Sequence, residues 1–205
     1  MGVPLGCLTV TPRLWLVRHG ESEWNRRGLV QGHASDPKLT DRGINQARAV
    51  LGRLDTRSVG ALYSSDLLRA VQTAEILGSA LGTQIRVEAA LRERSFGVAE
   101  GLPLTELGAD SGVEADRVVD PDRAPVGGES VRRLYERAVG FATEALQRHP
   151  GDDLVFVTHG GVIRVLRAWC ARIGPDEMSW GAVENGAVFE EVAPVVCATT
   201  GRSGW

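Results

Sequence analysis

The chain has 205 residues, of which 43% are hydrophobic and 24% charged, values that are ordinary for one globular domain. The net charge is only -3 and the 23 basic residues are spread along the chain, which argues against a nucleic acid or an anionic membrane as partner. No run approaches the ~18 apolar residues of a membrane span, and Met1 to Pro12 lacks the features of a secretory signal. We therefore expect a cytoplasmic protein with a small ligand.

The three cysteines are an odd number and show no CxxC spacing. They predict neither a disulfide framework nor a zinc site, so we interpret Cys7, Cys170 and Cys197 as reduced thiols.

Short apolar runs alternate with stretches of helical periodicity along the chain. The apolar runs are typical of strands that are buried on both faces. A segment at 97–128, whose part at 108–128 is rich in Gly, Pro and Asp, reads as a cap or loop. In chain order the patterns predict a strand at 14–17, a helix at 44–54, a strand at 60–63, a helix at 67–81, a strand at 85–87, the cap, a helix at 131–146, a strand at 154–157, a helix at 162–173 and a strand at 187–192.

Strands that alternate with helices predict an α/β fold. We expect a three-layer α/β/α sandwich, in which a mostly parallel central sheet is covered by helices on both faces. The pattern continues along the chain without an internal repeat, so residues 1–205 are predicted to form a single domain.

Two of the predicted strands end in the same way, because His19 and His159 each close an apolar run and each precede a glycine. In open α/β sheets the ligand crevice lies beyond the carboxyl ends of the strands, so the two imidazoles are expected to meet. The glycines allow backbone N–H groups to approach a ligand, and N–H groups at a helix start favour an anion.

Two arginines are predicted at the same edge of the sheet. Arg18 directly precedes His19, and Arg69 falls in the first turn of the helix that follows the strand at 60–63. Two guanidinium groups suit a tetrahedral dianion, and this favours phosphate. A neutral imidazole could then attack the phosphoryl group, and a carboxylic acid such as Glu93 could supply the proton to the leaving alcohol.

Six segments between about Leu14 and Asn185 form an ordered set of motifs. They are RHGESEWN, QGHASDPKLTDRGINQA, SSDLLRAVQTA, LRERSFG, GGES and THGGVIR. In this order the set resembles the motifs of the histidine phosphatase superfamily, the phosphoglycerate mutase-like enzymes.

The resemblance implies that His19 is the phosphorylated nucleophile. It implies further that Arg18, Arg69 and His159 complete the phosphate pocket and that Glu93 is the proton donor and acceptor. No cofactor and no metal are implied, and the four histidines show no HxH or HExxH spacing.

By the same resemblance, further residues surround the phosphate and the rest of the substrate. Asn25 and the backbone at Gly160 would add hydrogen bonds to the phosphate. Ser22, Gln31 and Gly32 would face the substrate beyond its phosphate.

The sequence departs from the family's pattern after the glutamate motif. Val98 and Ala99 stand where many relatives have an acidic residue and an aromatic, and Arg94 directly follows Glu93. We expect Arg94 to point at the substrate. These departures leave the substrate class open.

The leading hypothesis is a phosphatase that hydrolyses small phosphorylated metabolites. Its first rival is a cofactor-dependent phosphoglycerate mutase; such relatives carry a longer, basic insertion after the glutamate motif, whereas residues 97–128 here hold only Arg117 and Arg123 as cations. A non-catalytic phosphate-binding protein is the second rival, and relatives of that kind usually lack one of the central residues. The sequence does not determine the oligomeric state, so a homodimer is an alternative to a monomer.

Overall fold

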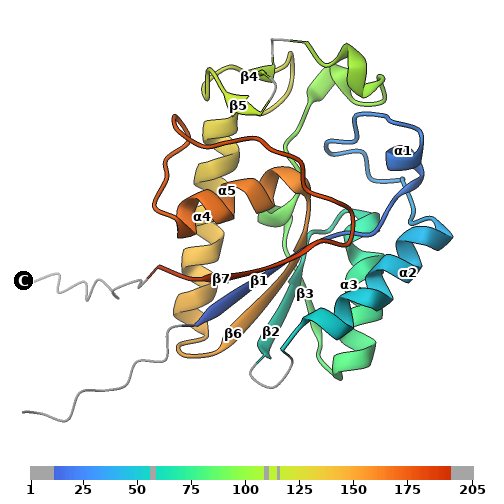
Figure 1. Ribbon diagram of the computed structural model, residues 1–205, viewed down its shortest axis with the longest axis vertical. Coiled ribbons are helices and arrows are strands. Elements are labelled where there is room, and N and C mark those ends of the chain that lie inside the picture. Colours follow the sequence, from blue (N-terminus) through green and yellow to red (C-terminus); the bar gives the residue numbers. More distant parts are fainter. Residues whose placement is uncertain (1–11, 56–58, 109–110, 115, 195–205) are drawn as a thin grey trace, which may run out of the picture.

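The computed structural model describes residues 12–55, 59–108, 111–114 and 116–194. A five-stranded sheet forms the middle layer, and helices cover both of its faces (Figure 1). Three neighbouring pairs of strands are parallel and the fourth pair, β1 with β7, is antiparallel. The predicted three-layer α/β/α sandwich with a mostly parallel sheet is confirmed. In spatial order the strands are β3 (Ile85–Val87), β2 (Val59–Ser64), β6 (Asp153–Thr158), β1 (Arg13–Arg18) and β7 (Val188–Val192).

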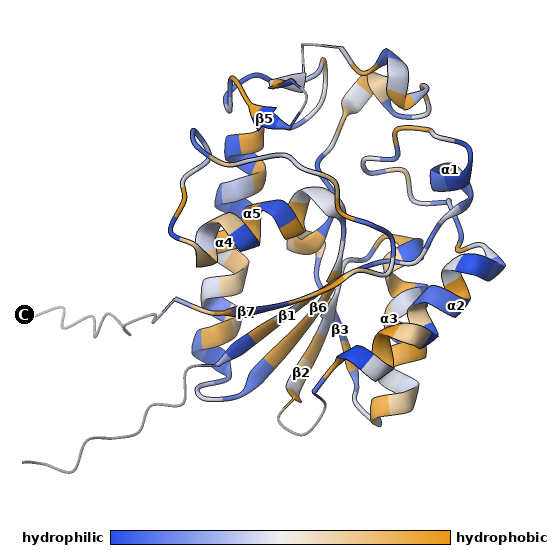
Figure 2. Cartoon of the chain, viewed as in Figure 1, coloured by the Kyte–Doolittle hydropathy of each residue, from blue (hydrophilic) through white to orange (hydrophobic). Residues whose placement is uncertain are grey.

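The helices divide between the two faces of the sheet. In Figure 1, α4 and α5 lie on one face, and α2 and α3 on the other. Figure 2 shows that the helices present apolar residues to the sheet and polar residues outward, as amphipathic helices do. The helices are α1 (Glu23–Arg26), α2 (Asp41–Val50), α3 (Leu68–Leu81), α4 (Val131–Arg148) and α5 (Gly160–Cys170).

The central strands are buried on both faces because successive side chains point to opposite sides. Leu14 and Leu16 join the core cluster of α4 and α5, whereas Trp15 and Val17 join the cluster of α2 and α3. This explains why the sequence of β1 is a continuous apolar run rather than an alternation of apolar and polar residues.

Two predicted elements differ from the structure in detail. β3 pairs with β2 alone among the described strands, and Val87 is 52% exposed, so the expectation that this strand is buried on both faces was wrong. The run is an edge strand, which a three-residue apolar pattern cannot distinguish from a central one. α5 ends at Cys170 rather than near Ile173, because the chain turns at Arg172, whose φ is 62°.

The cap segment, defined as residues 97–128, contains short 3-10 turns and a small hairpin of β4 (Val113–Glu114) and β5 (Arg117–Val118). Figure 1 places this hairpin above the start of α4, and the hairpin is tied to the loop that follows α5. Arg117 forms a bridge with Ser179, and the N–H of Val118 donates to the carbonyl of Met178 at 3.4 Å. Val118 is buried in the same core cluster as α4 and α5.

Cys170 forms no disulfide with any residue that the structure describes, and burial raises the pKa of its thiol to about 12. Cys7 and Cys197 lie outside the described residues. Within the part of the chain that the structure describes, no helix combines the length and the apolar character that a membrane crossing requires.

Candidate active site

The two histidines meet because their strands end side by side. β1 and β6 are paired in register up to Arg18 and Thr158, and the next residue of each strand is a histidine. The N–H of His19 donates to the carbonyl of Thr158 at 3.0 Å, and the ring centroids of His19 and His159 are 5.0 Å apart. Both imidazoles are buried, with 2% and 0% of their surface exposed. The structure therefore brings the two imidazoles together at the strand ends, as the sequence predicts.

The hydrogen bonds of His19 fix its tautomer. Its Nδ1 lies 2.7 Å from the carbonyl oxygen of Gly20, which can only accept, so Nδ1 carries the proton. Nε2 then has a free lone pair and no partner among the described residues. Burial lowers the pKa of His19 well below its ordinary 6.5, and the charges of Arg69 and Arg18 lower it further. The ring is consequently a neutral nucleophile at physiological pH.

His159 is held by its other nitrogen. Its Nε2 lies 2.9 Å from the hydroxyl of Ser65, whose oxygen also accepts the N–H of Leu67 at 3.3 Å. A Ser65 hydroxyl that donates to Nε2 leaves the proton of the neutral ring on Nδ1, and this atom is buried without a partner among the described residues. Burial, followed by Arg69, His19 and Arg18, lowers the pKa of His159 well below 6.5. His159 can therefore offer one N–H to an anion.

Arg69 is fixed by the loop that precedes α2. Its side chain is 1% exposed, and its two terminal nitrogens donate to the carbonyls of Ala34 and Gly32, each at 2.8 Å. Its Nε is buried and has no hydrogen-bond partner in the described part of the chain. Burial lowers its pKa to about 10, so the guanidinium stays charged at neutral pH.

Arg18 is anchored in a similar way, because its Nη1 donates to the carbonyl of Val183 and its buried Nε has no partner. Burial lowers its pKa, whereas the charge of Glu93 raises it. Each of the two arginines thus has a buried N–H that no described residue satisfies. A buried donor without a partner is costly, and an anion bound in the cavity would satisfy it.

Glu93 sits at the amino end of α5. Its Oε1 accepts the N–H of Gly161 at 3.0 Å and the N–H of Arg94 at 2.8 Å. The loop that carries Glu93 is fixed by two side chains from elsewhere in the chain. His33 contacts the Glu93 carbonyl at 2.8 Å, and Arg137 of α4 donates to three carbonyls of the loop, including that of Glu93 at 3.3 Å. The carboxyl group is therefore held in one position.

The side chains of His19, Arg18, Arg69 and Glu93 line a cavity of about 370 Å³. A neighbouring cavity of about 240 Å³ shares Arg164 with it but contains none of the predicted site residues. His159 is not among the residues that line the larger cavity, but its ring is adjacent to that of His19, which does line it. The predicted site residues that line the larger cavity are Arg18, His19, Asn25, Gln31, Gly32, Arg69, Glu93 and Gly160.

Ser22 does not face the cavity, contrary to the expectation. It is 0% exposed and forms the N-cap of α1, because its hydroxyl accepts the N–H of Asn25 at 3.2 Å. The same hydroxyl donates to the amide oxygen of Gln31 at 2.7 Å. Ser22 is therefore a residue that positions Asn25 and Gln31. Asn25 receives further contacts at its Oδ1, including one from Asn185 at 3.1 Å, which leaves its Nδ2 available to a ligand.

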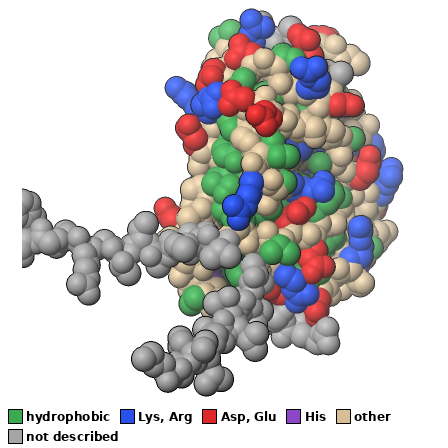
Figure 3. Space-filling model, turned by 60° about the vertical axis from the view of Figure 1, so that its left-hand side comes forward, with side chains coloured by type: hydrophobic (Ala, Val, Ile, Leu, Met, Phe, Trp, Pro, Cys, Tyr) green, Lys and Arg blue, Asp and Glu red, His purple; other side chains and the backbone are tan. Residues whose placement is uncertain are grey.

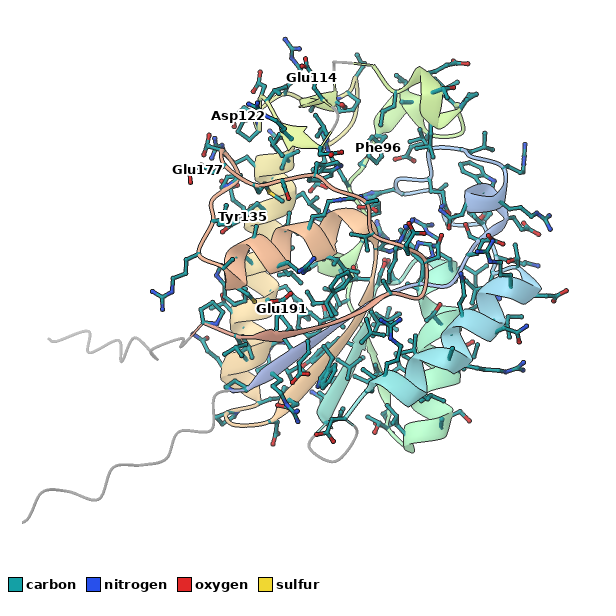
Figure 4. The ribbon with its side chains drawn as sticks, in the orientation of Figure 1. Phe96, Glu114, Asp122, Tyr135, Glu177 and Glu191 are labelled. Carbon is teal, nitrogen blue, oxygen red and sulfur yellow. The ribbon has the colours of Figure 1, made fainter. Side chains whose placement is uncertain are left out.

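The expectation that Arg94 points at the substrate was also wrong. Arg94 is 0% exposed and is not one of the residues that line the cavity. Its Nε donates to the carbonyl of Glu129 at 2.7 Å, and its guanidinium lies over the ring of Phe96 at 5.4 Å. Figure 4 labels Phe96 on the segment that leads from the sheet to the cap. Arg94 thus ties this segment to the start of α4.

Arg164 and Trp180 are among the residues of the cavity wall that sequence reasoning missed. Arg164 is four residues after Gly160 on α5, and positions i and i+4 share one face of a helix. That spacing within THGGVIR could have indicated its place. Trp180 lies in a loop without periodicity, and nothing in the sequence marks it.

The model of the histidine phosphatase superfamily (branch 1) matches residues 14–191. The chain belongs to this superfamily. Among curated relatives, the phosphoglycerate mutase-like protein 4 of Arabidopsis thaliana is 41% identical over 161 residues, which cover 74% of this chain and 67% of the relative. The putative phosphoserine phosphatase 2 of Hydrogenobacter thermophilus is 31% identical, with 87% of this chain and 88% of the relative covered.

A mycobacterial glucosyl-3-phosphoglycerate phosphatase, solved in complex with VO3, has a similar structure. The TM-score is 0.76 at 31% identity, with 87% of this chain and 92% of that chain covered. Together with the phosphoserine phosphatase relatives, this likeness confirms the predicted enzyme class. The chain is a phosphatase, a hydrolase of the histidine phosphatase superfamily.

Proposed function

We propose that this histidine phosphatase hydrolyses small phosphorylated metabolites through a phosphohistidine on His19. One observation carries the proposal. The Nε2 of His19 is an unprotonated nitrogen to which no described residue donates, in a cavity that also holds the guanidinium groups of Arg18 and Arg69. A neutral nucleophile beside two fixed cations is the arrangement that attack on a phosphate dianion requires.

In the first step, Nε2 of His19 attacks the phosphorus and the bond to the leaving alcohol oxygen breaks. Glu93 gives its proton to that oxygen, so the product leaves as a neutral alcohol. Arg18, Arg69 and the Nδ1–H of His159 stabilise the negative charge on the equatorial oxygens of the phosphoryl group in the transition state. The N–H groups at the start of α5, where Gly160 lies, and the amide of Asn25 add hydrogen bonds.

In the second step, a water molecule attacks the phosphohistidine and the bond between phosphorus and nitrogen breaks. The carboxylate of Glu93 takes the proton of the water, and inorganic phosphate leaves. His19 returns to its neutral tautomer with Nδ1 still donating to Gly20, so neither ring nitrogen needs to change its role.

The mutase alternative is supported by the names of several relatives, but the cap favours hydrolysis. A mutase must keep its phosphohistidine away from water until the product is rephosphorylated, and mutase relatives use basic residues of the cap to hold a second acidic group of the substrate. The two described cations of the cap, Arg117 and Arg123, do not line the cavity, and Arg123 is paired with Asp120 at 3.7 Å. The cap instead contributes the apolar side chains of Leu104 and Leu107.

The test is phosphoryl trapping combined with turnover. The wild type should hydrolyse a chromogenic aryl phosphate, with inhibition by vanadate and no loss in chelator. Acid quench during turnover should trap phosphate that is acid-labile and base-stable on His19. His19→Ala should lose both signals.

His149→Gln is the matched control, because His149 lies at the end of α4 and contacts Tyr63 at 3.0 Å rather than the cavity. It should keep both signals. A trapped phosphate on serine or aspartate, or one that survives His19→Ala, would refute the mechanism.

A further inference from the structure

The cavity contains more positive charge than the phosphate group needs. Arg18 and Arg69 suffice to bind a tetrahedral dianion, yet a third guanidinium, that of Arg164, lines the same cavity. The carboxyl groups of the cavity wall are those of Glu93 and Glu184, and Glu184 is exposed. Solvent therefore screens Glu184 more than the other groups.

Arg164 is fixed in place but not neutralised. Its Nε donates to the carbonyl of Gly181 at 2.6 Å, and its guanidinium lies 5.0 Å from the centroid of the Trp180 ring. It forms no ion pair with any described residue, and its two terminal nitrogens have no hydrogen-bond partner among those residues. Burial lowers its pKa, whereas the charge of Glu93 raises it. Two donors of a half-buried cation are thus free for a ligand.

The free edge of Arg164 lies close to the phosphate end of the cavity. A Cβ placed on Gly160 would lie 3.0 Å from its Nη1, and Gly160 is the first residue of α5. The hydrogen bond to Gly181 and the contact with Trp180 hold the guanidinium in place, and a guanidinium held in this way favours a planar bidentate partner over a spherical one. A carboxylate has that shape.

We propose that Arg164 is a specificity-determining residue that binds a carboxylate on the substrate, so that the preferred substrates are small phosphorylated carboxylic acids. This inference rests on the proposed function. When Glu93 is protonated and ready to donate, Arg18, Arg69 and Arg164 carry three positive charges against the two negative charges of the phosphate. One further negative charge on the substrate balances the buried groups.

The other walls of the cavity fit the same substrate class. Phe96, Leu104 and Leu107 are apolar and leave Arg164 as the cation that lines the wall outside the phosphate pocket. A cavity of about 370 Å³ accommodates a metabolite of a few carbons beside its phosphate.

The experiment compares pairs of substrates that differ only in the carboxylate. The pairs are 3-phosphoglycerate with glycerol 3-phosphate, and phosphoserine with phosphoethanolamine. Wild-type kcat/KM should be at least ~10-fold higher for the carboxylated member of at least one pair. Arg164→Gln should reduce that preference to about 1, by lowering kcat/KM for the carboxylated member and changing the other by less than ~3-fold.

Arg167→Gln is the matched control. Arg167 lies on the same helix, is exposed, and pairs with Glu191 at 2.7 Å, a residue labelled in Figure 4. This variant should keep the wild-type preference. An Arg164→Gln variant that loses activity equally on both members of each pair would overturn the inference, and so would a wild type without any preference. A wild type that hydrolyses no phosphomonoester, the aryl phosphate included, would instead contradict the proposed function.

Discussion

Acid should destabilise the folded protein through His19 and His159. Both imidazoles are buried and have depressed pKa values in the folded state, first because of burial and then because of nearby arginines. In the unfolded chain both titrate near 6.5. Below that pH the unfolded state binds more protons than the folded state, so the free energy of unfolding falls as the pH falls.

The size of the effect follows from linkage. Each imidazole that stays neutral in the folded state lowers the free energy of unfolding by about 1.4 kcal/mol between pH 7.5 and pH 5.5. The two histidines together therefore contribute about 2.7 kcal/mol, a large part of the 5–15 kcal/mol that is typical of a domain. Above pH 7.5 their contribution to the pH dependence should vanish.

The measurement is urea unfolding followed by circular dichroism at several pH values, for the wild type and for a His19→Asn, His159→Gln double variant. The Asn amide can replace the donor to the Gly20 carbonyl, and the Gln amide can replace the contact with Ser65. The wild type and the variant have all other titrating groups in common. The difference between their pH profiles is therefore the contribution of the two imidazoles to the free energy of unfolding. Parallel profiles, with a difference below about 1 kcal/mol over this range, would refute the reasoning.

Two glycines give further predictions. Gly161→Ala should lower kcat on the order of 100-fold, because the new Cβ would lie 2.2 Å from Oε1 of Glu93 and must displace the carboxyl group. Steady-state kinetics measures this, and an unchanged kcat would contradict the role of Glu93. Gly140→Ala is the control, since Gly140 is exposed in α4 and its Cβ would meet nothing within 4 Å. It should leave activity unchanged and raise the free energy of unfolding by about 1 kcal/mol in urea titrations.

The fold could be predicted from the sequence because its signals are local and repeated. The apolar stripe of α4 and the apolar runs of β1 and β6 reflect burial that each element undergoes along its whole length. Element ends and edges were less predictable. The exposure of β3 depends on which strand is last in the sheet, and this is decided by contacts distant in sequence.

The candidate site also contains residues that could be predicted from the sequence and residues that could not. The residues at strand ends and helix starts, such as His19 and Arg69, were predictable because topology brings those ends to one edge. The directions of loop side chains were not predictable. Arg94 follows Glu93 directly, yet its side chain runs to the carbonyl of Glu129, and a pattern of neighbours in sequence does not reveal such a turn. Figure 3 likewise shows basic and acidic side chains interspersed on one face, without a patch that would mark a site.

The two histidines and most of the outer wall of the cavity are held by different elements. His19 and His159 directly follow paired central strands, which are rigid because they are buried on both faces. Apart from Arg164 of α5, the outer wall comes mainly from loops, and Glu100 joins two of them, since its Oε1 accepts the N–H groups of His33 and Phe96, each at 2.9 Å. Changes in these loops can alter which phosphate ester fits without moving His19. Such a division accounts for relatives that share this fold and are named for different substrates.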